Sequence, residues 1–224
     1  MTSDRSMYAE KTDAYFDRPR IEIAPLLPDR MDRVLEIGCG AGTTLKWLRT
    51  QRSVQYAVGI DLSPEAAERA KSIFDVVRTG DIETMELPTG PFDLVLALDV
   101  LEHLVDPWLM MKRLQATLGP GAAIIVSLPN ISHYSVCVPL LLRGQWNYAD
   151  DGLLDRTHLR FFTRQTAVNL VTGSGLVLDK IELVRGGPQF LSVKMRWYSL
   201  KVLNWIQPRH LLDWQFLIRV KAAC

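Results

Sequence analysis

The chain contains little cysteine and no cysteine motif. Three cysteines, Cys39, Cys137 and Cys224, stand far apart among 224 residues. Zinc sites built from closely spaced Cys and His pairs are therefore excluded, and an odd number of thiols does not form a complete disulfide framework. We expect reduced thiols, as in a protein of the cytoplasm.

Long apolar runs and an excess of one charge are also missing. The longest apolar stretch, VCVPLLL at 136–142, contains Pro139 and is far shorter than the roughly 20 residues that span a bilayer. The first residues, MTSDRSMYAEKTD, lack the apolar core of a secretion signal. A net charge of +1 provides no overall positive field for nucleic acid. These absences predict a soluble, cytoplasmic protein without a nucleic-acid partner.

What the sequence does contain is an alternation of strand and helix signals. We expect a short helix over 20–28, helices over 43–51, from Ser63-Pro64 and from Asp106-Pro107, and strands over 33–38, 55–61, 75–80, 92–99 and 122–128. Such alternation predicts a parallel sheet with right-handed crossovers. Beyond residue 129 it loosens. There we expect a long connection (130–162), a helix from Thr163 to Gly173, a strand over 176–184, a helix over 192–206, and an antiparallel edge strand over 214–222.

A glycine-rich turn joins the first expected strand to the first helix. EIGCGAG spans residues 36–42. Glycines there permit a tight turn and a close approach of a ligand to the main chain, and the following helix presents unpaired N–H groups. Asp61 ends the next strand, at about the spacing where an acid meets a ribose diol in nucleotide-binding folds. The combination predicts a nucleotide site.

The turn also limits which nucleotide fits. A dinucleotide-binding motif, G-x-G-x-x-G, that begins at Gly38 would need its third glycine at position 43, but residue 43 is Thr. Glu36 lies two residues before the first glycine and would repel a pyrophosphate. It would instead attract a cation such as the ammonium group of an amino acid. A ribose together with an amino acid describes S-adenosylmethionine.

Four segments carry a resemblance to a known family. VLEIGCGAG, VGIDLS, GDIE and FDLVLALDVLEHL together resemble the class I S-adenosylmethionine-dependent methyltransferases over about residues 30–130. The resemblance implies an α/β, Rossmann-like fold: a mostly parallel, seven-stranded sheet with helices on both faces. It also implies the cofactor-binding residues, which are Glu36, Gly38, Cys39, Gly40 and Gly42 for the methionine and ribose, Asp61 for the ribose hydroxyls, Leu62, Asp81 and Ile82 for the adenine, and Leu98 and Asp99 for the methionine end.

The same resemblance divides the chain by role. It implies one domain over 1–224, with an N-terminal lid or helix segment at 1–30, a cofactor-binding half at 31–129, and an acceptor-binding half at 130–224 that includes the last two strands. Glu102 and His103 resemble the family's Glu-His pair after the fourth strand. For His103 a cap or a buried hydrogen bond is favoured over proton transfer.

The acceptor pocket is expected in the connection after the fifth strand. Ligands of such folds bind beyond the carboxyl ends of the strands, where this connection begins, and long ordered loops are usually functional. The segment at 128–163 is rich in aromatic and charged side chains, which suit sugars or phosphorylated sugars. The predicted acceptor-binding residues are Tyr134, Trp146, Tyr148, Asp155, Arg156 and Arg160. The segment loosely resembles methyltransferases associated with bacterial polysaccharides and, more distantly, the methionine-biosynthesis methyltransferase-like family.

His158, within GLLDRTHLRFFT at 152–163, is the predicted catalytic base, and His133 is the second candidate. Imidazole is well matched to taking a proton near neutral pH. The alternative is structural: Phe161 and Phe162 in the core, Thr163 as a helix cap, and Asp155 in an ion pair with Arg156 or Arg160. No compact His, Asp and Glu cluster is evident, so no metal is predicted.

The sequence thus predicts an S-adenosylmethionine-dependent methyltransferase that methylates an oxygen of a sugar, a glycan or another small polar acceptor. The alternative is a protein of this fold that binds or stabilises another biosynthetic enzyme. The segment 194–212 combines an apolar stripe with basic residues. We expect it either to pack on the domain or to contact a membrane surface or a second subunit.

Overall fold

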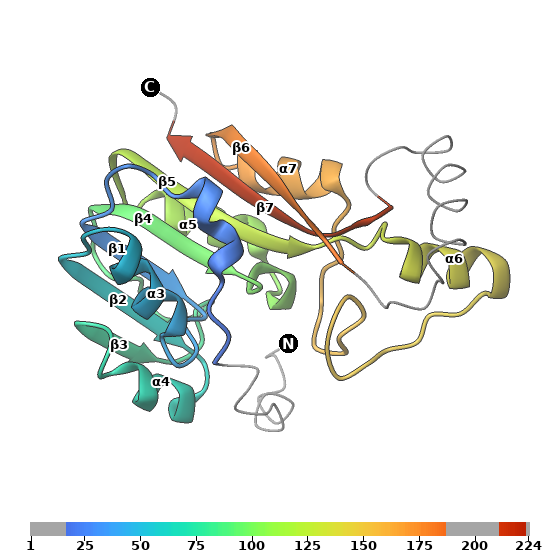
Figure 1. Cartoon of the computed structure of the whole chain (residues 1–224), viewed down its shortest axis with the longest axis horizontal. Helices are drawn as coiled ribbons and strands as arrows, with labels where there is room; N and C mark the ends of the chain where they lie inside the picture. The colour runs from blue at the N-terminus through green and yellow to red at the C-terminus, as the bar shows by residue number, and fades with distance from the viewer. Residues whose placement is uncertain (1–16, 187–210, 223–224) are drawn as a thin grey trace.

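A seven-stranded sheet organises the protein (Figure 1). The structure, a computed structural model, describes residues 17–186 and 211–222. The strand order is β3-β2-β1-β4-β5-β7-β6. The strands are β1 (Arg33–Ile37), β2 (Tyr56–Asp61), β3 (Val76–Thr79), β4 (Phe92–Leu98), β5 (Leu118–Pro129), β6 (Leu176–Arg185) and β7 (Asp213–Ala222). All seven expected strands are therefore present.

The sheet is mixed, which corrects the expectation of a mostly parallel one. Strands β1 to β5 pair in parallel, whereas β7 pairs antiparallel with both β5 and β6. The antiparallel direction of the last strand was expected, but its edge position is wrong. β7 inserts between β5 and β6, and the edge strands are β3 and β6. Burial agrees, because β7 is mostly buried whereas β6 is mostly half-exposed.

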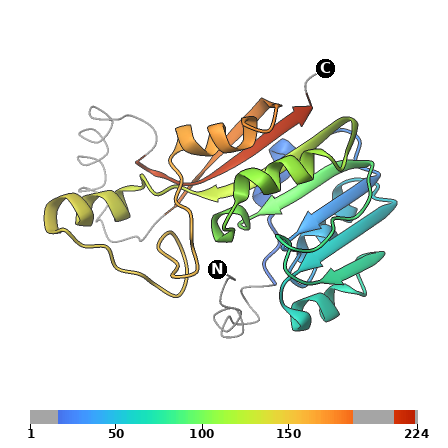
Figure 2. The same cartoon turned by 180° about the vertical axis from the view of Figure 1, so that it is seen from behind.

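Helices cover both faces of the sheet, as predicted. One face is covered by η1 (Ile21–Leu26), α3 (Thr43–Gln51) and α4 (Pro64–Ala70), which share a core with β1 and β4. The other carries α5 (Pro107–Gln115) and α7 (Arg164–Thr172), seen from behind in Figure 2. Between β4 and α5 lies the short helix η2 (Leu101–His103).

The expected helix starts are confirmed by side-chain caps. Ser63 accepts a hydrogen bond from the Ala66 N–H, and Asp106 from that of Leu109. Thr163 forms a full capping box at the start of α7. Each such cap typically stabilises a helix by about 1 kcal/mol.

The connection after β5 contains a helix that the sequence analysis did not predict. Helix α6 (Tyr134–Arg143) includes Pro139 and ends at Gly144, whose φ is 62°. The rest of the connection runs back beneath the sheet edge to α7 (Figure 1). The helix expected over 192–206, and all but the last two residues of 194–212, lie outside the described residues. Within the described ranges, no helix combines the length and the apolar character needed to cross a membrane.

Candidate active site

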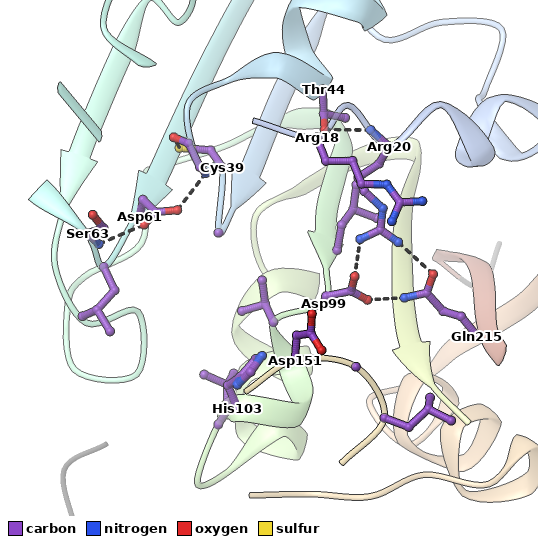
Figure 3. Close-up of a pocket in the computed structure, with 18 of the residues that line it drawn as sticks. Arg18, Arg20, Cys39, Thr44, Asp61, Ser63, Asp99, His103, Asp151 and Gln215 are labelled. Atoms are coloured by element: carbon purple, nitrogen blue, oxygen red, sulfur yellow. Dashed lines mark hydrogen bonds and ion pairs between the residues drawn. The ribbon is translucent and has the colours of Figure 1, made fainter. Parts of the chain in front are cut away.

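A cavity of about 980 Å³ opens at the carboxyl ends of the central strands (Figure 3). Its wall includes ten of the eleven residues predicted to bind the cofactor: Glu36, Gly38, Cys39, Gly40, Asp61, Leu62, Asp81, Ile82, Leu98 and Asp99. The connection after β5 supplies the other side through Asn147 and residues 149–154. One cavity therefore touches both the glycine turn and the predicted acceptor segment.

The glycine turn has the backbone geometry that only glycine adopts readily. Gly38 and Gly40 have φ values of 66° and 53°. A Cβ on Gly38 would overlap the side chain of Val100. Gly42 has a different task, because it is the N-cap of α3 with φ 82°, and a Cβ there would press on Ile73 and Phe74 at 3.2 Å. Gly42 is not among the described residues that line the cavity.

Asp61 ends β2 and lies against the turn. Its carboxylate accepts hydrogen bonds from the backbone N–H groups of Gly40 (2.7 Å) and Ser63 (2.9 Å), and Figure 3 shows the bond from Ser63. Burial raises the pKa of Asp61, and these N–H groups partly oppose the rise. The carboxylate is thus held in one orientation at the cavity wall, where it can accept further hydrogen bonds.

Glu36 is a buried acid without a complete set of partners. It is 2% exposed, and its Oε2 atom accepts no hydrogen bond from the part of the chain that the structure describes. Burial and the negative charge of Asp61 raise the pKa of Glu36 to about 8, although the positive charge of Arg20 opposes the rise. An orphaned carboxylate oxygen in a cavity wall is suited to a cationic or hydroxyl donor from a ligand.

Asp99 follows β4 and has a positive φ of 55°, which is uncommon for a residue other than glycine. Its carboxylate pairs with Arg20 and accepts hydrogen bonds from Gln215 and from the Ser127 hydroxyl (2.6 Å). Arg20 also donates to the Gln215 side chain at 2.8 Å. The network joins the N-terminal segment, β4, β5 and β7 at one point of the wall (Figure 3).

The sequence analysis placed Asp99 at the site but missed Arg20 and Gln215. The signal was weak, since Arg20 lies before a short apolar turn and Gln215 lies within an alternating strand. Arg20 also donates to Glu22 at 2.5 Å. Arg20 and Gln215 are 195 positions apart in the sequence, and only the fold brings both side chains to the Asp99 carboxylate.

The predicted adenine end has fewer polar groups. Asp81 accepts from the Glu83 N–H at 2.9 Å, Ile82 is 8% exposed, and both line the cavity with Leu62. The apolar side chains of Leu62 and Ile82, with the Asp81 carboxylate beside them, fit a purine ring that carries an amino group.

The predicted base, His158, lies beside a second, smaller cavity of about 90 Å³. Its wall also includes Glu102, His103 and Asp155, and it shares Asp99 and Gln215 with the large cavity. The rings of His103 and His158 meet edge to face with centroids 4.7 Å apart. Burial, and to a smaller extent the neighbouring His158, lower the pKa of His103 to about 4. His103 is therefore neutral at pH 7.

Glu102 and both histidines form a compact buried group. Their possible ligand atoms all lie within 4.8 Å of one another. The expectation that the chain has no compact cluster of this kind is therefore wrong. His103 Nδ1 lies 3.2 Å from the Thr157 carbonyl, so the buried hydrogen bond favoured for His103 is confirmed.

His133, the second candidate base, is placed as a cap. Its Nδ1 accepts from the Ser135 N–H, and its Nε2 lies 2.9 Å from the carbonyl oxygen of Gly186. Burial lowers its pKa. His133 is fully buried and does not belong to the described lining of either cavity.

Most residues predicted to bind the acceptor lie near the cavities rather than in their walls. Trp146 packs edge to face on Phe161 at 5.2 Å, and Tyr148 packs on Trp146 at 6.4 Å. Tyr134 stacks on His133 at 4.3 Å. None of these three is in the described lining of either cavity.

The charged residues of the connection also differ from expectation. Arg156, predicted to bind the acceptor, pairs with Asp150 at 2.8 Å and not with Asp155 as in the structural alternative. Arg160 donates to the Val105 carbonyl and lies over the Trp108 ring at 5.7 Å. Asp155 accepts two hydrogen bonds from Thr157, 2.9 Å from its N–H and 2.7 Å from its hydroxyl, and lines the smaller cavity. The large cavity is lined instead by Asn147, Asp150 and Asp151.

Fold and site together define a class of protein. A Rossmann-like sheet with a glycine turn after β1, an acid after β2 and a cavity over both is that of a protein binding a nucleoside-containing ligand. The orphaned Glu36 oxygen, the Asp61 carboxylate and the apolar wall at Ile82 match an ammonium group, a ribose and a purine.

Comparison with known proteins identifies the family. Residues 8–181 match the family model described as a methyltransferase domain, so the chain belongs to the methyltransferase domain family. This family and fold imply S-adenosylmethionine as the cofactor. A solved S-adenosylmethionine-dependent methyltransferase from Archaeoglobus fulgidus shares the fold, with a TM-score of 0.63 and 20% identity over 97% of this chain and 94% of that one.

Two curated relatives have similar sequences over part of this chain. A ubiquinone biosynthesis O-methyltransferase from Bradyrhizobium diazoefficiens is 36% identical over 104 residues, covering 44% of this chain and 40% of that protein. Ajmaline N-methyltransferase from Rauvolfia serpentina is 32% identical over 111 residues, covering 44% and 37%. The chain thus spans less than half the length of these relatives.

Proposed function

We propose that the protein transfers a methyl group from S-adenosylmethionine to a hydroxyl oxygen of a small polar acceptor, with sugars and glycans as the favoured class. The observation that carries this proposal is the single cavity of about 980 Å³, which reaches from Glu36 and Asp61 to Asn147, Asp150 and Asp151. Carboxylate and amide groups accept hydrogen bonds from hydroxyls, so the far end suits a hydroxyl-rich molecule. The similarity to an O-methyltransferase supports oxygen as the acceptor atom.

In this proposal the residues predicted for the cofactor keep their roles. When bound, S-adenosylmethionine supplies a methyl group on a positively charged sulfur that leaves readily. Glu36 accepts hydrogen bonds from the ammonium group, and Asp61 accepts from the ribose hydroxyls. Arg20 and Gln215 hold Asp99 and so fix the strained turn after β4. Gly42 acts through the geometry of the turn.

The acceptor half supplies position and proton handling. Aligning the acceptor oxygen with the methyl carbon can contribute about 7–11 kcal/mol of the barrier. The hydroxyl must also lose its proton. The buried group of Glu102, His103 and His158 can promote this loss, because all three side chains line the smaller cavity and His103 lines the large one as well. The assignment of His158 as the base itself stays a prediction. The division into a cofactor half at 31–129 and an acceptor half at 130–224 is part of the same proposal.

The test is release of S-adenosylhomocysteine across a panel of acceptors that includes nucleotide sugars, free glycans, lipid-linked saccharides and phenols. Turnover with a hydroxylated acceptor supports the proposal, and Asp61→Ala should abolish most of it whereas Glu68→Ala should not. Glu68 is a matched control because its carboxylate lies on the exposed side of α4 and pairs with Lys71. Cofactor binding without turnover on any acceptor would favour the partner-protein alternative. Turnover only with amines would overturn the choice of oxygen.

A further inference from the structure

The buried group of Glu102, His103 and His158 is drawn together from two distant segments. Glu102 and His103 belong to η2, directly after β4, and His158 comes from the connection after α6. The Glu102 carbonyl oxygen accepts from the N–H groups of both Leu159 and Arg160, each at 2.9 Å. These two bonds attach the connection to η2 beside the His158 ring. Backbone hydrogen bonds therefore fix the segment that carries Glu102 and His103 against the segment that carries His158.

The Glu102 carboxylate lacks partners within the described chain. It is 0% exposed, and neither of its oxygens accepts a hydrogen bond from any residue that the structure describes. Burying an ionised carboxylate without partners is costly, and buried charges are ordinarily paired or coordinate a metal. A carboxylate with two open oxygens, within 4.8 Å of two imidazoles, is consistent with a cation between them.

The two imidazoles are oriented as metal ligands are. His103 Nδ1 lies 3.2 Å from the Thr157 carbonyl oxygen, and His158 Nδ1 lies 3.3 Å from that of Leu153. In a neutral imidazole whose Nδ1–H donates to a carbonyl, the lone pair is on Nε2. Histidines that bind metals almost always donate their other ring N–H to a carbonyl or carboxylate in this way.

We propose that Glu102, His103 and His158 form a binding site for a divalent transition-metal ion. Two imidazoles and one carboxylate favour ions such as Zn²⁺, Co²⁺ or Fe²⁺ over Mg²⁺ and Ca²⁺, which prefer oxygen ligands. Three protein ligands leave coordination positions open, as in catalytic rather than structural sites. All three residues line the smaller cavity, which provides space for further ligands at the open coordination positions.

The position of this site suggests a task in the reaction. The smaller cavity shares Asp99, Gly152 and Leu153 with the large one. An ion there would act as a Lewis acid next to the acceptor and promote loss of its proton. His158 would then be a metal ligand rather than the base predicted from the sequence. This role rests on the proposed function, whereas metal binding itself does not.

The site can be tested with Co²⁺ as the probe, on the full chain without a polyhistidine tag. Calorimetry and the visible absorption of Co²⁺ should both report one bound equivalent. Glu102→Gln and His158→Gln should each weaken binding more than tenfold, since even the loss of an outer-shell partner typically costs 10–100-fold. His133→Gln is the matched control, because His133 is also buried but lies outside this group. It should bind Co²⁺ like the wild type.

Failure of the metal site and failure of the proposed methyltransferase function give different results. Circular dichroism identifies any variant that fails to fold, and the second variant then decides. Failure of the folded wild type to bind Co²⁺ overturns the metal site, and so does equal binding by the wild type and both folded variants. Titration of S-adenosylmethionine in the presence of a chelator tests cofactor binding by itself. Co²⁺ binding without cofactor binding would keep the site and reject the methyltransferase role.

Discussion

The two ends of the large cavity are built in different ways. At the cofactor end, Glu36, Gly38, Gly40 and Asp61 lie at the ends of adjacent parallel strands, and 21 positions separate the most distant hydrogen-bonded pair, Gly40 and Asp61. At the acceptor end, Asp150 and Asp151 lie in a long connection that returns from α6. The first end depends on strand register and turn geometry, and the second on tertiary packing. We expect substitutions at the two ends to affect different steps.

The largest effect is expected at the smaller cavity, which adjoins the acceptor end and shares Gly152 and Leu153 with it. His158→Ala should lower turnover by about two to four decades, because it removes either the predicted base or a ligand of the proposed metal ion that promotes loss of the proton. Its affinity for S-adenosylmethionine should stay close to that of the wild type, because His158 lines only the smaller cavity among the two described. Single-turnover kinetics with calorimetry on the same preparation checks both. Weakened cofactor binding in a folded variant would remove the distinction between the two ends.

At the cofactor end, Asp61→Ala should weaken S-adenosylmethionine binding by about tenfold to somewhat over a hundredfold, since hydrogen bonds to a charged group contribute about 1.5–3 kcal/mol. The dissociation constant is measured by calorimetry, with Glu68→Ala as the exposed control. An unchanged constant in folded Asp61→Ala would reject the assignment of this residue.

A smaller effect concerns pH. Burial raises the pKa of Glu36 to about 8 in the free protein, and an ammonium partner favours the ionised form. Binding therefore releases a proton, and the affinity for S-adenosylmethionine should increase with pH by up to about tenfold per unit. The range from about pH 5.5 to about pH 7 is informative, because the α-amino group stays protonated there. Glu36→Gln should remove this dependence. A wild-type affinity that is constant over the range would contradict the role of Glu36.

The smallest effect is expected away from both ends. Thr163 caps α7 with a full capping box, so Thr163→Ala should lower the free energy of unfolding by about 1 kcal/mol. Cofactor affinity and turnover should not change. Urea unfolding monitored by circular dichroism measures the loss. A large fall in turnover at full occupancy of the folded state would show that α7 positions the acceptor connection more directly than the structure indicates.

The same contrast explains what the sequence could predict. The boundaries of α3 coincide with the prediction, and β1 and β2 differ from theirs by one residue each. The strand, turn and helix that place the glycine turn are adjacent in the chain, so local patterns were sufficient. Ten of the eleven predicted cofactor residues line the cavity for this reason.

Predictions that depended on distant packing were less accurate. Helix α6 was not predicted within the long connection, yet it forms with His133 as its cap, Pro139 inside it and Gly144 at its end. Trp146 and Tyr148 have the composition of a sugar-binding surface, yet they pack on their own segment. The pairing of His103 with His158, 55 positions apart, has no sequence spacing that would reveal it. Sequence patterns identified these side chains but not their neighbours.

The central claim is that S-adenosylmethionine binds over the glycine turn and the ends of β1 and β2. Hydrogen–deuterium exchange with and without the cofactor measures this directly, because it reports on backbone amides along the chain. We predict increased protection over residues 36–42, 61–63 and 80–83, with little change in α7. Protection confined to other segments at saturating cofactor, or no protection anywhere, would contradict the account.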